Sequence, residues 1–312
     1  MRIGIIGDLH LTNKSPERRI DDYWKTLCRK VSQSLDIFDG RKCNIIIQVG
    51  DFFDAPTVAN KVKSEVMQLL HCFGRFGDER MLCVYGQHDI SGHSKATLPN
   101  SPLVELESAR VVKILGDNPV IAGPQQASVF FYGASFGEPV PEVLDKDAYN
   151  ILVTHRMVGD RALWPGQVLP GPRQFLRQCP DYALILAGDY HYRFIETWQG
   201  RIIINPGAVI RKTISRFDLE HQPAVVIFDT DTNESEVIEL GIEPIEKIFD
   251  LTKRDVRTKD NSLLVELVKR LKEGDEKILG WKGFLLKVLE EKKASMGVRQ
   301  VIDEILEEVK NG

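Results

Sequence analysis

The sequence lacks the cysteine pattern of a disulfide-stabilised secreted protein. Its five cysteines are an odd number, and no two of them have C-x-x-C spacing. It also lacks a hydrophobic run long enough to span a membrane, and the short apolar start MRIGIIGDLH has no h-region of a signal peptide. We therefore expect a soluble, cytoplasmic protein with reduced thiols and no membrane partner.

Neither sign of charge is in large excess. The 312 residues contain 41 Lys and Arg and 45 Asp and Glu, so the net charge is 41 − 45 = −4. This excludes a polycation that binds nucleic acid non-specifically, and any nucleic-acid contact must come from a local basic patch. Hydrophobic residues make up 43% of the chain, which suffices for a sizeable core. The length fits one large domain with a smaller appendage, or two domains.

The first 90 residues alternate between strand and helix patterns. Apolar runs predict strands at 2–7, 43–49 and 81–85, and helical periodicity predicts helices ending near 38 and covering 58–73. Ser15 is predicted as the N-cap of the first helix, with Pro16 in its first turn. The order β-α-β-α-β indicates an α/β fold with a parallel sheet.

From Val111 onwards, short β-like runs alternate with Gly and Pro turns. They lie at 111–115, 119–122, 128–134, 149–154, 183–187, 193–197, 201–205, 223–229 and 234–240. Beyond residue 250 the chain is rich in charge and has amphipathic helical stripes. We predict a main domain at 1–220, a small β or capping segment at 221–252, and a linker with C-terminal helices at 253–312.

Polar clusters follow five of the predicted strands. They supply Asp8, His10, Asp51, Gln87, His88, Asp89, His155, Asp189 and His191. Ligands of α/β folds bind beyond the carboxyl ends of strands, so these clusters are expected to converge. Carboxylates mixed with imidazoles suit Mn, Fe, Zn or similar ions. The candidates exceed what one ion needs, which favours two ions that together hold both oxygens of a displacement at phosphorus.

In this order and spacing the clusters resemble the motifs of the calcineurin-like metallophosphoesterases. That family's pattern is D-x-H, GD, GN-H-D/E, a lone H and G-H-x-H. Its counterparts here are Asp8-Leu9-His10, Gly50-Asp51, Gly86-Gln87-His88-Asp89, His155 and Gly188-Asp189-Tyr190-His191. The resemblance covers residues 1–210, and it implies a sandwich of two central β-sheets flanked by helices.

The resemblance also implies a role for each matching residue. Three residues would hold the first ion, namely Asp8, His10 and His191. Asp51 would bridge to a second ion, completed by Gln87, His155 and Asp189. His88 would bind no metal. It would stabilise charge on the phosphorus centre or protonate the leaving oxygen, with Asp89 orienting it.

The sequence departs from the family pattern at two positions. Gln87 stands where the family has Asn, and Asp189 stands where it has His. Both changes fall on the second ion, and an aspartate oxygen is a harder ligand than an imidazole. The implied cofactor is therefore a pair of divalent ions, Mn being favoured and Mg an alternative.

Within this superfamily the chain is most similar to the SbcD-type DNA nucleases of bacteria and bacteriophages. The similarity rests on Gly50-Asp51-Phe52-Phe53-Asp54, on Asn205-Pro206-Gly207-Ala208 followed by Arg211, and on the charged linker with terminal helices. It implies a DNA exonuclease or endonuclease of a recombination and repair complex. It also implies a homodimer that binds an SMC-like ATPase subunit through its C-terminal helices.

Two other functions remain open on the sequence alone. A phosphoesterase of the same fold would act on small phosphate esters or phosphoproteins, and a non-catalytic scaffold would use the fold for assembly. Taken singly, each site residue has an ordinary structural interpretation, such as a helix cap for Asp51 or a buried structural role for His155. By the same reasoning Asp54 is assigned to turn chemistry and His221 to a surface or structural role.

Overall fold

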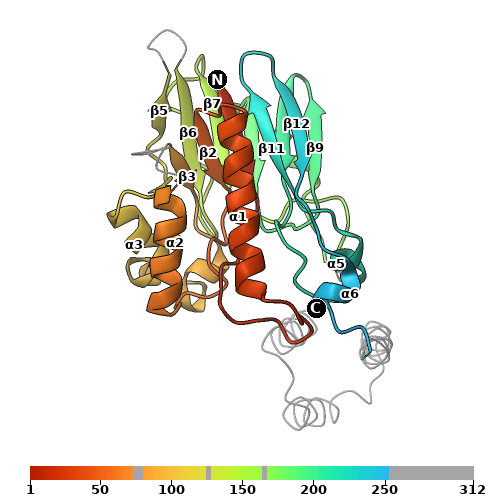
Figure 1. Cartoon of the computed structure of the whole chain (residues 1–312). Helices are drawn as coiled ribbons and strands as arrows, with labels where there is room; N and C mark the ends of the chain where they lie inside the picture. The colour runs from red at the N-terminus through yellow and green to blue at the C-terminus, as the bar shows by residue number, and fades with distance from the viewer. Residues whose placement is uncertain (73–79, 124–127, 164–166, 253–312) are drawn as a thin grey trace, which may run out of the picture. The chain divides into compact units, whose positions relative to one another are not determined.

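A computed structural model describes residues 1–72, 80–123, 128–163 and 167–252 (Figure 1). The chain divides after Leu251, and the unit Met1–Leu251 contains every described strand and helix. The linker and helices predicted at 253–312 lie outside the described residues.

Strands and helices alternate through the first half of this unit. The strands are β1 (Arg2–Ile6), β2 (Ile45–Gln48), β3 (Met81–Cys83), β4 (Lys113–Ile114), β5 (Val120–Ala122), β6 (Val129–Ala134), β7 (Tyr149–Thr154), β8 (Leu184–Ala187), β9 (Phe194–Trp198), β10 (Arg201–Asn205), β11 (Ala224–Asp229) and β12 (Glu234–Glu239). The α-helices are α1 (Tyr23–Gly40), α2 (Asn60–Cys72), α3 (Pro102–Ser108), α4 (Pro172–Gln178), α5 (Arg216–Glu220) and α6 (Ile245–Ile248).

The strands form two six-stranded sheets, which confirms the predicted α/β architecture. Their orders are β12-β11-β1-β2-β3-β4 and β5-β6-β7-β8-β10-β9. In each sheet four neighbouring strands run parallel, β1 to β4 in the first and β6, β7, β8 and β10 in the second. The carboxyl ends of these parallel strands therefore lie at one edge of each sheet.

The alternation of side chains along each strand divides the core into layers. On β2, Ile47 belongs to the apolar cluster that joins the two sheets, while its neighbour Ile46 packs under the helices. On β8, Leu184 and Leu186 face the other sheet, while Ile185 packs on the α4 side. Strands buried on both faces explain the continuous apolar runs of the sequence.

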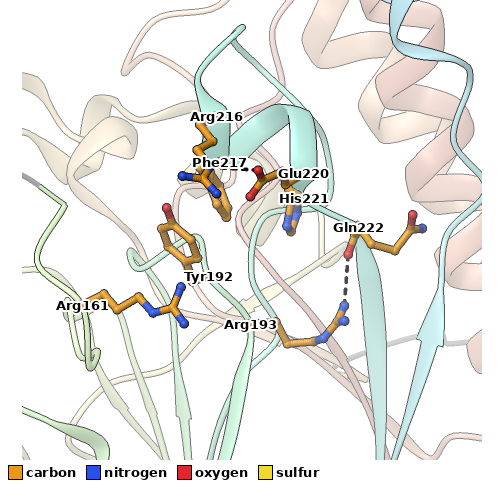
Figure 2. Close-up of a pocket in the computed structure, with 8 residues that line it drawn as sticks. All are labelled: Arg161, Tyr192, Arg193, Arg216, Phe217, Glu220, His221 and Gln222. Carbon is orange, nitrogen blue, oxygen red and sulfur yellow. Dashed lines mark hydrogen bonds and ion pairs between the residues drawn. The ribbon is translucent and has the colours of Figure 1, made fainter. Parts of the chain in front are cut away.

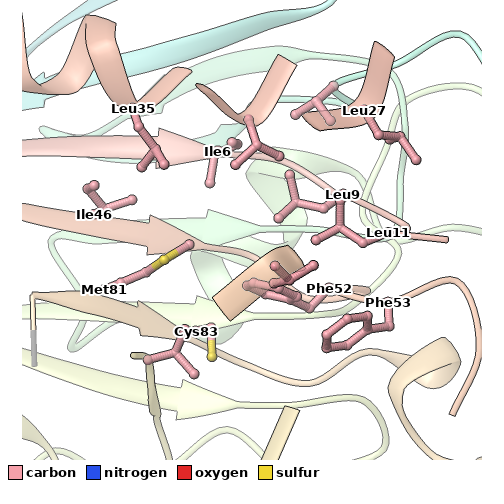
Figure 3. Packing of buried hydrophobic residues seen from close by; sticks show 14 of the residues in the cluster. Ile6, Leu9, Leu11, Leu27, Leu35, Ile46, Phe52, Phe53, Met81 and Cys83 are labelled. Atoms are coloured by element: carbon pink, nitrogen blue, oxygen red, sulfur yellow. The ribbon is translucent and has the colours of Figure 1, made fainter. Parts of the chain in front are cut away.

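Helices α1 and α2 cover the outer face of the first sheet (Figure 1). The contact is made by Leu27 and Leu35 of α1, which lie with Ile6 and Ile46 in one buried cluster (Figure 3). Deep burial of these large aliphatic side chains stabilises the layer by roughly 1.5–3 kcal/mol each.

The predicted start of the first helix is wrong. Helix α1 begins at Tyr23, and its N-cap is Asp22, whose side chain accepts a hydrogen bond from Lys25 N. Ser15 and Pro16 lie in a preceding loop, where Arg19 forms an isolated bridge with Phe249. Tertiary pairing of this loop thus outweighs the local Ser-Pro capping signal.

The segment 221–252 is built into the first sheet. Strand β11 pairs antiparallel with β1, matching Ile3 with Phe228, and β12 pairs with β11. Phe228 is fully buried between the sheets, so β11 belongs to the main core.

Cys28, Cys43, Cys83 and Cys179 are free thiols. Cys43, Cys83 and Cys179 are buried and Cys28 is half-buried. Burial raises the pKa of Cys43 and of Cys179 to about 11, so these thiols are protonated at neutral pH. Within the described part of the chain, no helix combines the length and the apolarity that a membrane span requires.

The close approach of α1 to β1 depends on Gly4. A Cβ at this position would overlap the ring of Phe38. We expect Gly4→Ala to lower the free energy of unfolding by about 1–3 kcal/mol, because the core cannot accommodate the added methyl group. Gly40→Ala is the matched control, since nothing lies within 4 Å of a Cβ there. Urea denaturation measures both variants, and equal stabilities would contradict a tight contact between Gly4 and Phe38.

Candidate metal centre

The predicted site residues come together at the carboxyl ends of the parallel strands. Asp8 and His10 follow β1, Asp51 follows β2, and Asp189 follows β8. His10, Asp51 and Asp189 all adopt left-handed backbone conformations, with φ of 46°, 49° and 73°. Asp and His tolerate this region better than most residues, and residues in this region are concentrated at functional sites.

Asp51 occupies the centre of the site. Its Oδ2 lies 3.4 Å from Nε2 of His155, 3.6 Å from Nε2 of His10 and 4.0 Å from Nε2 of His88. The other oxygen, Oδ1, accepts a hydrogen bond of 2.9 Å from His88 N. The carboxylate is 1% exposed, so one oxygen is fixed by the backbone while the other faces three imidazoles.

The orientation of His155 is set by the backbone of the neighbouring sheet. Its Nδ1 lies 2.8 Å from the carbonyl oxygen of Val49 and therefore donates to it. This leaves Nε2 facing Asp51, and Nε2 is buried without a hydrogen-bond partner of good geometry among the described residues. A backbone carbonyl on one ring nitrogen and an unpaired, buried second nitrogen are the arrangement of a metal-binding histidine.

A second group lies beside Asp51 and consists of Asp8, His10 and His191. Nε2 of His191 lies 3.2 Å from Asp8 Oδ2 and 3.3 Å from Nε2 of His10. Potential ligand atoms of these three residues lie within 4.8 Å of one another, as do those of Asp8, Asp51 and His155. Asp8 and Asp51 thus connect two groups of potential ligands.

Gln87 and Asp189, the two departures from the family pattern, contact each other. Gln87 Nε2 donates to Asp189 Oδ1 over 2.8 Å, and Asp189 Oδ1 lies 4.0 Å from Nε2 of His155. The amide oxygen Oε1 of Gln87 is buried without a partner among the described residues. The pair therefore offers a carboxylate and an unsatisfied amide oxygen on the His155 side of the site.

His88 lies at the open edge of the site, and its side chain is 41% exposed. Its Nδ1 lies 3.0 Å from the carbonyl oxygen of Asp54 and donates to it, so Nε2 faces Asp51. The Asp89 carboxylate accepts hydrogen bonds from the backbone N–H groups of Phe52, Phe53 and Gly86, at 3.1, 2.9 and 2.9 Å. The orientation of His88 by Asp89 stays a prediction.

Asp89 therefore joins two loops of the site. It ties the turn that carries His88 to the turn that follows Asp51, and its burial is complete. Burial and the nearby Asp51 charge raise the pKa of Asp89, while the three backbone donors lower it.

Asp54 is a site residue that the sequence analysis assigned only to turn chemistry. Its Oδ1 lies 3.3 Å from Nδ1 of His10, and the same carboxylate forms an ion pair with Lys212. Its backbone carbonyl accepts from His88. The final Asp of Gly50-Asp51-Phe52-Phe53-Asp54 was the available signal, but a turn residue and a positioning residue have the same sequence pattern.

The charges of the site stabilise one another. Burial raises the pKa of Asp51, but His155, His10 and His88 outweigh it and hold the pKa below its usual range. Burial lowers the pKa of His155 and of His191, but the carboxylates that face them raise both above the ordinary value. For His10 burial dominates and lowers the pKa, so its Nε2 is available as a neutral ligand.

The residues present fit a pair of divalent cations. Two aspartates and four histidines form overlapping groups of potential ligands, and an orphaned Nε2 and an orphaned amide oxygen lie beside them. Unpaired buried polar atoms are costly unless a partner is supplied, and a cation supplies one. The clusters are consistent with a binuclear divalent metal site. Which atom binds which ion stays a prediction.

Other residues that the sequence analysis noted have structural contacts. Arg211 is buried, and its Nε donates to the carbonyl oxygen of His221 over 2.7 Å. His221 is itself buried, and its ring nitrogen lies 2.6 Å from the Ala208 carbonyl oxygen. Asn205 donates to Tyr190 O and accepts from Gly207 N, which shapes the loop beneath the site.

Comparison with known proteins identifies the family of this chain. The profile of the calcineurin-like phosphoesterase superfamily domain matches residues 1–233, and the chain belongs to this superfamily. A comparison with curated proteins found no match. Solved structures of similar fold include an archaeal phosphodiesterase, at 18% identity and a TM-score of 0.40, with 77% of this chain and 100% of that chain covered. Another is a Staphylococcus aureus protein assigned as a 5'-nucleotidase, at 13% identity and a TM-score of 0.46, with coverage of 83% and 57%.

The contact between Asp54 and His10 gives a testable positioning role. We expect Asp54→Ala to weaken Mn²⁺ binding about 10–100-fold, because the ring of His10 loses the carboxylate that fixes its orientation. Isothermal titration calorimetry measures the affinity, and Asp54→Glu should restore part of it. The control is Asp36→Ala on the exposed face of α1. Equal affinities for the Asp54 and Asp36 variants would contradict the assignment.

Proposed function

We propose that the protein is a metal-dependent DNA nuclease that hydrolyses phosphodiester bonds. Membership of the calcineurin-like superfamily and the Asp/His clusters support a metallophosphoesterase. The observation that carries the proposal is the position of His88 beside Asp51. A half-exposed imidazole stands at the edge of a buried group of potential metal ligands, where a leaving oxygen can reach it.

The chain's own residues would bind the phosphate and manage the proton. When bound, two divalent cations would activate the attacking water and neutralise the charge that develops at phosphorus. Asp51 would bridge the two ion sites. One site would be completed by Asp8, His10 and His191, and the other by Gln87, His155 and Asp189. His88 donates its Nδ1 proton to the Asp54 carbonyl, which turns Nε2 toward the site, and in the doubly protonated imidazolium form Nε2 would donate its own proton to the leaving oxygen.

We further propose Mn²⁺ as the working ion, with Mg²⁺ as an alternative. The imidazole nitrogens of His10 and His191 favour a transition metal at the first position. Gln87 lengthens the Asn ligand of the family pattern, and Asp189 replaces its His ligand. Both offer oxygen donors, which favour a harder ion at the second position.

The choice of DNA rests on the similarity to the SbcD-type nucleases at Gly50-Asp51-Phe52-Phe53-Asp54. Two of these residues, Phe52 and Phe53, are fully buried, and their backbone N–H groups hold Asp89. The segment therefore supports the site as well as carrying a candidate ligand. The exposed position of His88 also suits a long substrate, which must approach from solvent. Small phosphate esters and a non-catalytic assembly role are the alternatives.

Replacement of His88 tests this function. We expect His88→Ala to lower Mn²⁺-dependent degradation of labelled linear DNA about 100-fold or more, because the leaving oxygen loses its proton donor. Mn²⁺ affinity should change less than about twofold, since the half-exposed ring of His88 lies at the edge of the ligand groups. The matched control is His93→Ala, an exposed histidine of the next turn, which should keep full activity.

The same assay separates the alternatives. Turnover of 4-nitrophenyl phosphate with intact DNA would favour the small-ester phosphoesterase. Absence of hydrolysis of either substrate by protein with bound Mn²⁺ would favour the scaffold. Undiminished cleavage by His88→Ala would remove this residue from the mechanism.

We also propose a homodimer that binds an SMC-like ATPase through residues 253–312. Deletion of 262–312 should abolish copurification with a coiled-coil ATPase of the same source, because the amphipathic stripes would supply the docking surface. Hydrolysis of bis(4-nitrophenyl) phosphate should persist, since the groups of potential metal ligands in the described part of the chain lie before residue 192. Continued copurification after the deletion would contradict the docking role.

A further inference from the structure

A pocket of about 480 Å³ begins one residue beyond His191. It is lined by Arg161, Tyr192, Arg193, Arg216, Phe217, Glu220, His221 and Gln222 (Figure 2). Its volume lies in the range of small-molecule sites. Helix α5, which supplies three of these residues, lies at the end of the sheets where the metal-centre loops also lie (Figure 1).

The backbone connects this pocket to the metal centre. Tyr192 directly follows His191, whose carbonyl oxygen accepts a hydrogen bond of 3.2 Å from Ala208 N. The ring of His221, on the pocket wall, bonds in turn to the Ala208 carbonyl. A ligand in the pocket would therefore lie beside the loop that positions His191.

The pocket carries an excess of positive charge. Three arginines line it against one glutamate, and that glutamate, Glu220, pairs with Arg216 at 2.9 Å. Arg193 donates to the backbone carbonyl oxygen of Gln222, and Arg161 is exposed. Among the described residues, no carboxylate lies within 4 Å of either guanidinium group. Two arginines without carboxylate partners in one pocket suit a phosphate, which guanidinium groups bind in a bidentate way.

Aromatic rings form the other wall. The ring centroids of Tyr192 and Phe217 lie 3.9 Å apart, and those of Phe217 and His221 lie 4.9 Å apart. Tyr192 and Phe217 are only half-buried, and in Figure 2 both rings lie between the arginines. Half-exposed rings next to phosphate-binding groups can stack on a nucleobase.

We propose that this pocket is a nucleotide-binding subsite that holds the unit next to the phosphate being hydrolysed. Arg161 and Arg193 bind its phosphate, and Tyr192 with Phe217 contacts its base. The subsite rests on the proposed function for the reaction that it serves. It would make nucleotide-containing substrates preferred over simple phosphate esters, because binding energy away from the reacting phosphorus positions the substrate.

Binding without catalysis tests the subsite separately from the reaction. A fluorescein-labelled single-stranded oligothymidylate is titrated with the full chain in EDTA, and its anisotropy gives the affinity. We expect Arg161→Gln to weaken binding about tenfold, because a charge-assisted hydrogen bond is lost. The slope of log affinity against log salt should fall by roughly 0.7, the value for one phosphate on a single strand. Arg193→Gln should act in the same direction.

Arg177→Gln is the matched control. This arginine is exposed on α4, and none of its atoms lines the pocket. The control should keep both the affinity and the salt slope of the original chain. If Arg161→Gln and Arg177→Gln weaken binding equally, the arginines supply only diffuse charge and the subsite is refuted.

Competition experiments show whether the pocket recognises a whole nucleotide or only its phosphate. Thymidine 5'-phosphate should displace the oligothymidylate at a lower concentration than inorganic phosphate does, and Tyr192→Leu should remove this difference. Equal displacement by both competitors would overturn the nucleotide assignment. Binding of thymidine 5'-phosphate that Arg161→Gln abolishes, with oligothymidylate affinity unaffected, would support the nucleotide subsite and contradict the DNA substrate.

Discussion

The structure depends on the burial of one carboxylate, Asp51, between two sheets. A buried anion is unstable unless positive or hydrogen-bonding groups surround it. His10, His88 and His155 meet this requirement from three different loops, and the backbone of His88 holds the second oxygen. These three loops must therefore converge on Asp51, and they do so because strands of both sheets have their carboxyl ends on the same side.

Much of this arrangement follows from the sequence. Apolar runs such as 43–49 predict buried parallel strands, and polar residues directly after them predict a shared site. The start of α1 could not be predicted from the sequence, because the pairing of Arg19 with Phe249 joins residues far apart in the chain. The role of Asp54 was missed for the same reason. Its partners, His10 and Lys212, come from distant positions, and a local pattern contains no information about them.

The contacts of Asp89 show what motif comparison leaves out. The resemblance implies that Asp89 orients His88, and the structure adds that its carboxylate accepts hydrogen bonds from three backbone N–H groups. Two of these groups, in Phe52 and Phe53, lie far away in the chain, and a short motif contains no information about them. The pocket beside His191 corresponds to no sequence motif either, since Arg161, Tyr192 and Phe217 come from separate segments of the chain.

The left-handed backbone of His10, Asp51 and Asp189 places the site in conflict with the stability of the fold. Each such residue costs on the order of 1 kcal/mol or more in backbone energy, which glycine would not incur. Substitutions that relax these turns would therefore yield a more stable protein with fewer metal ligands. A selection for thermostability alone would remove residues of the metal centre first, so thermostable variants of this chain must be screened for metal binding at every round.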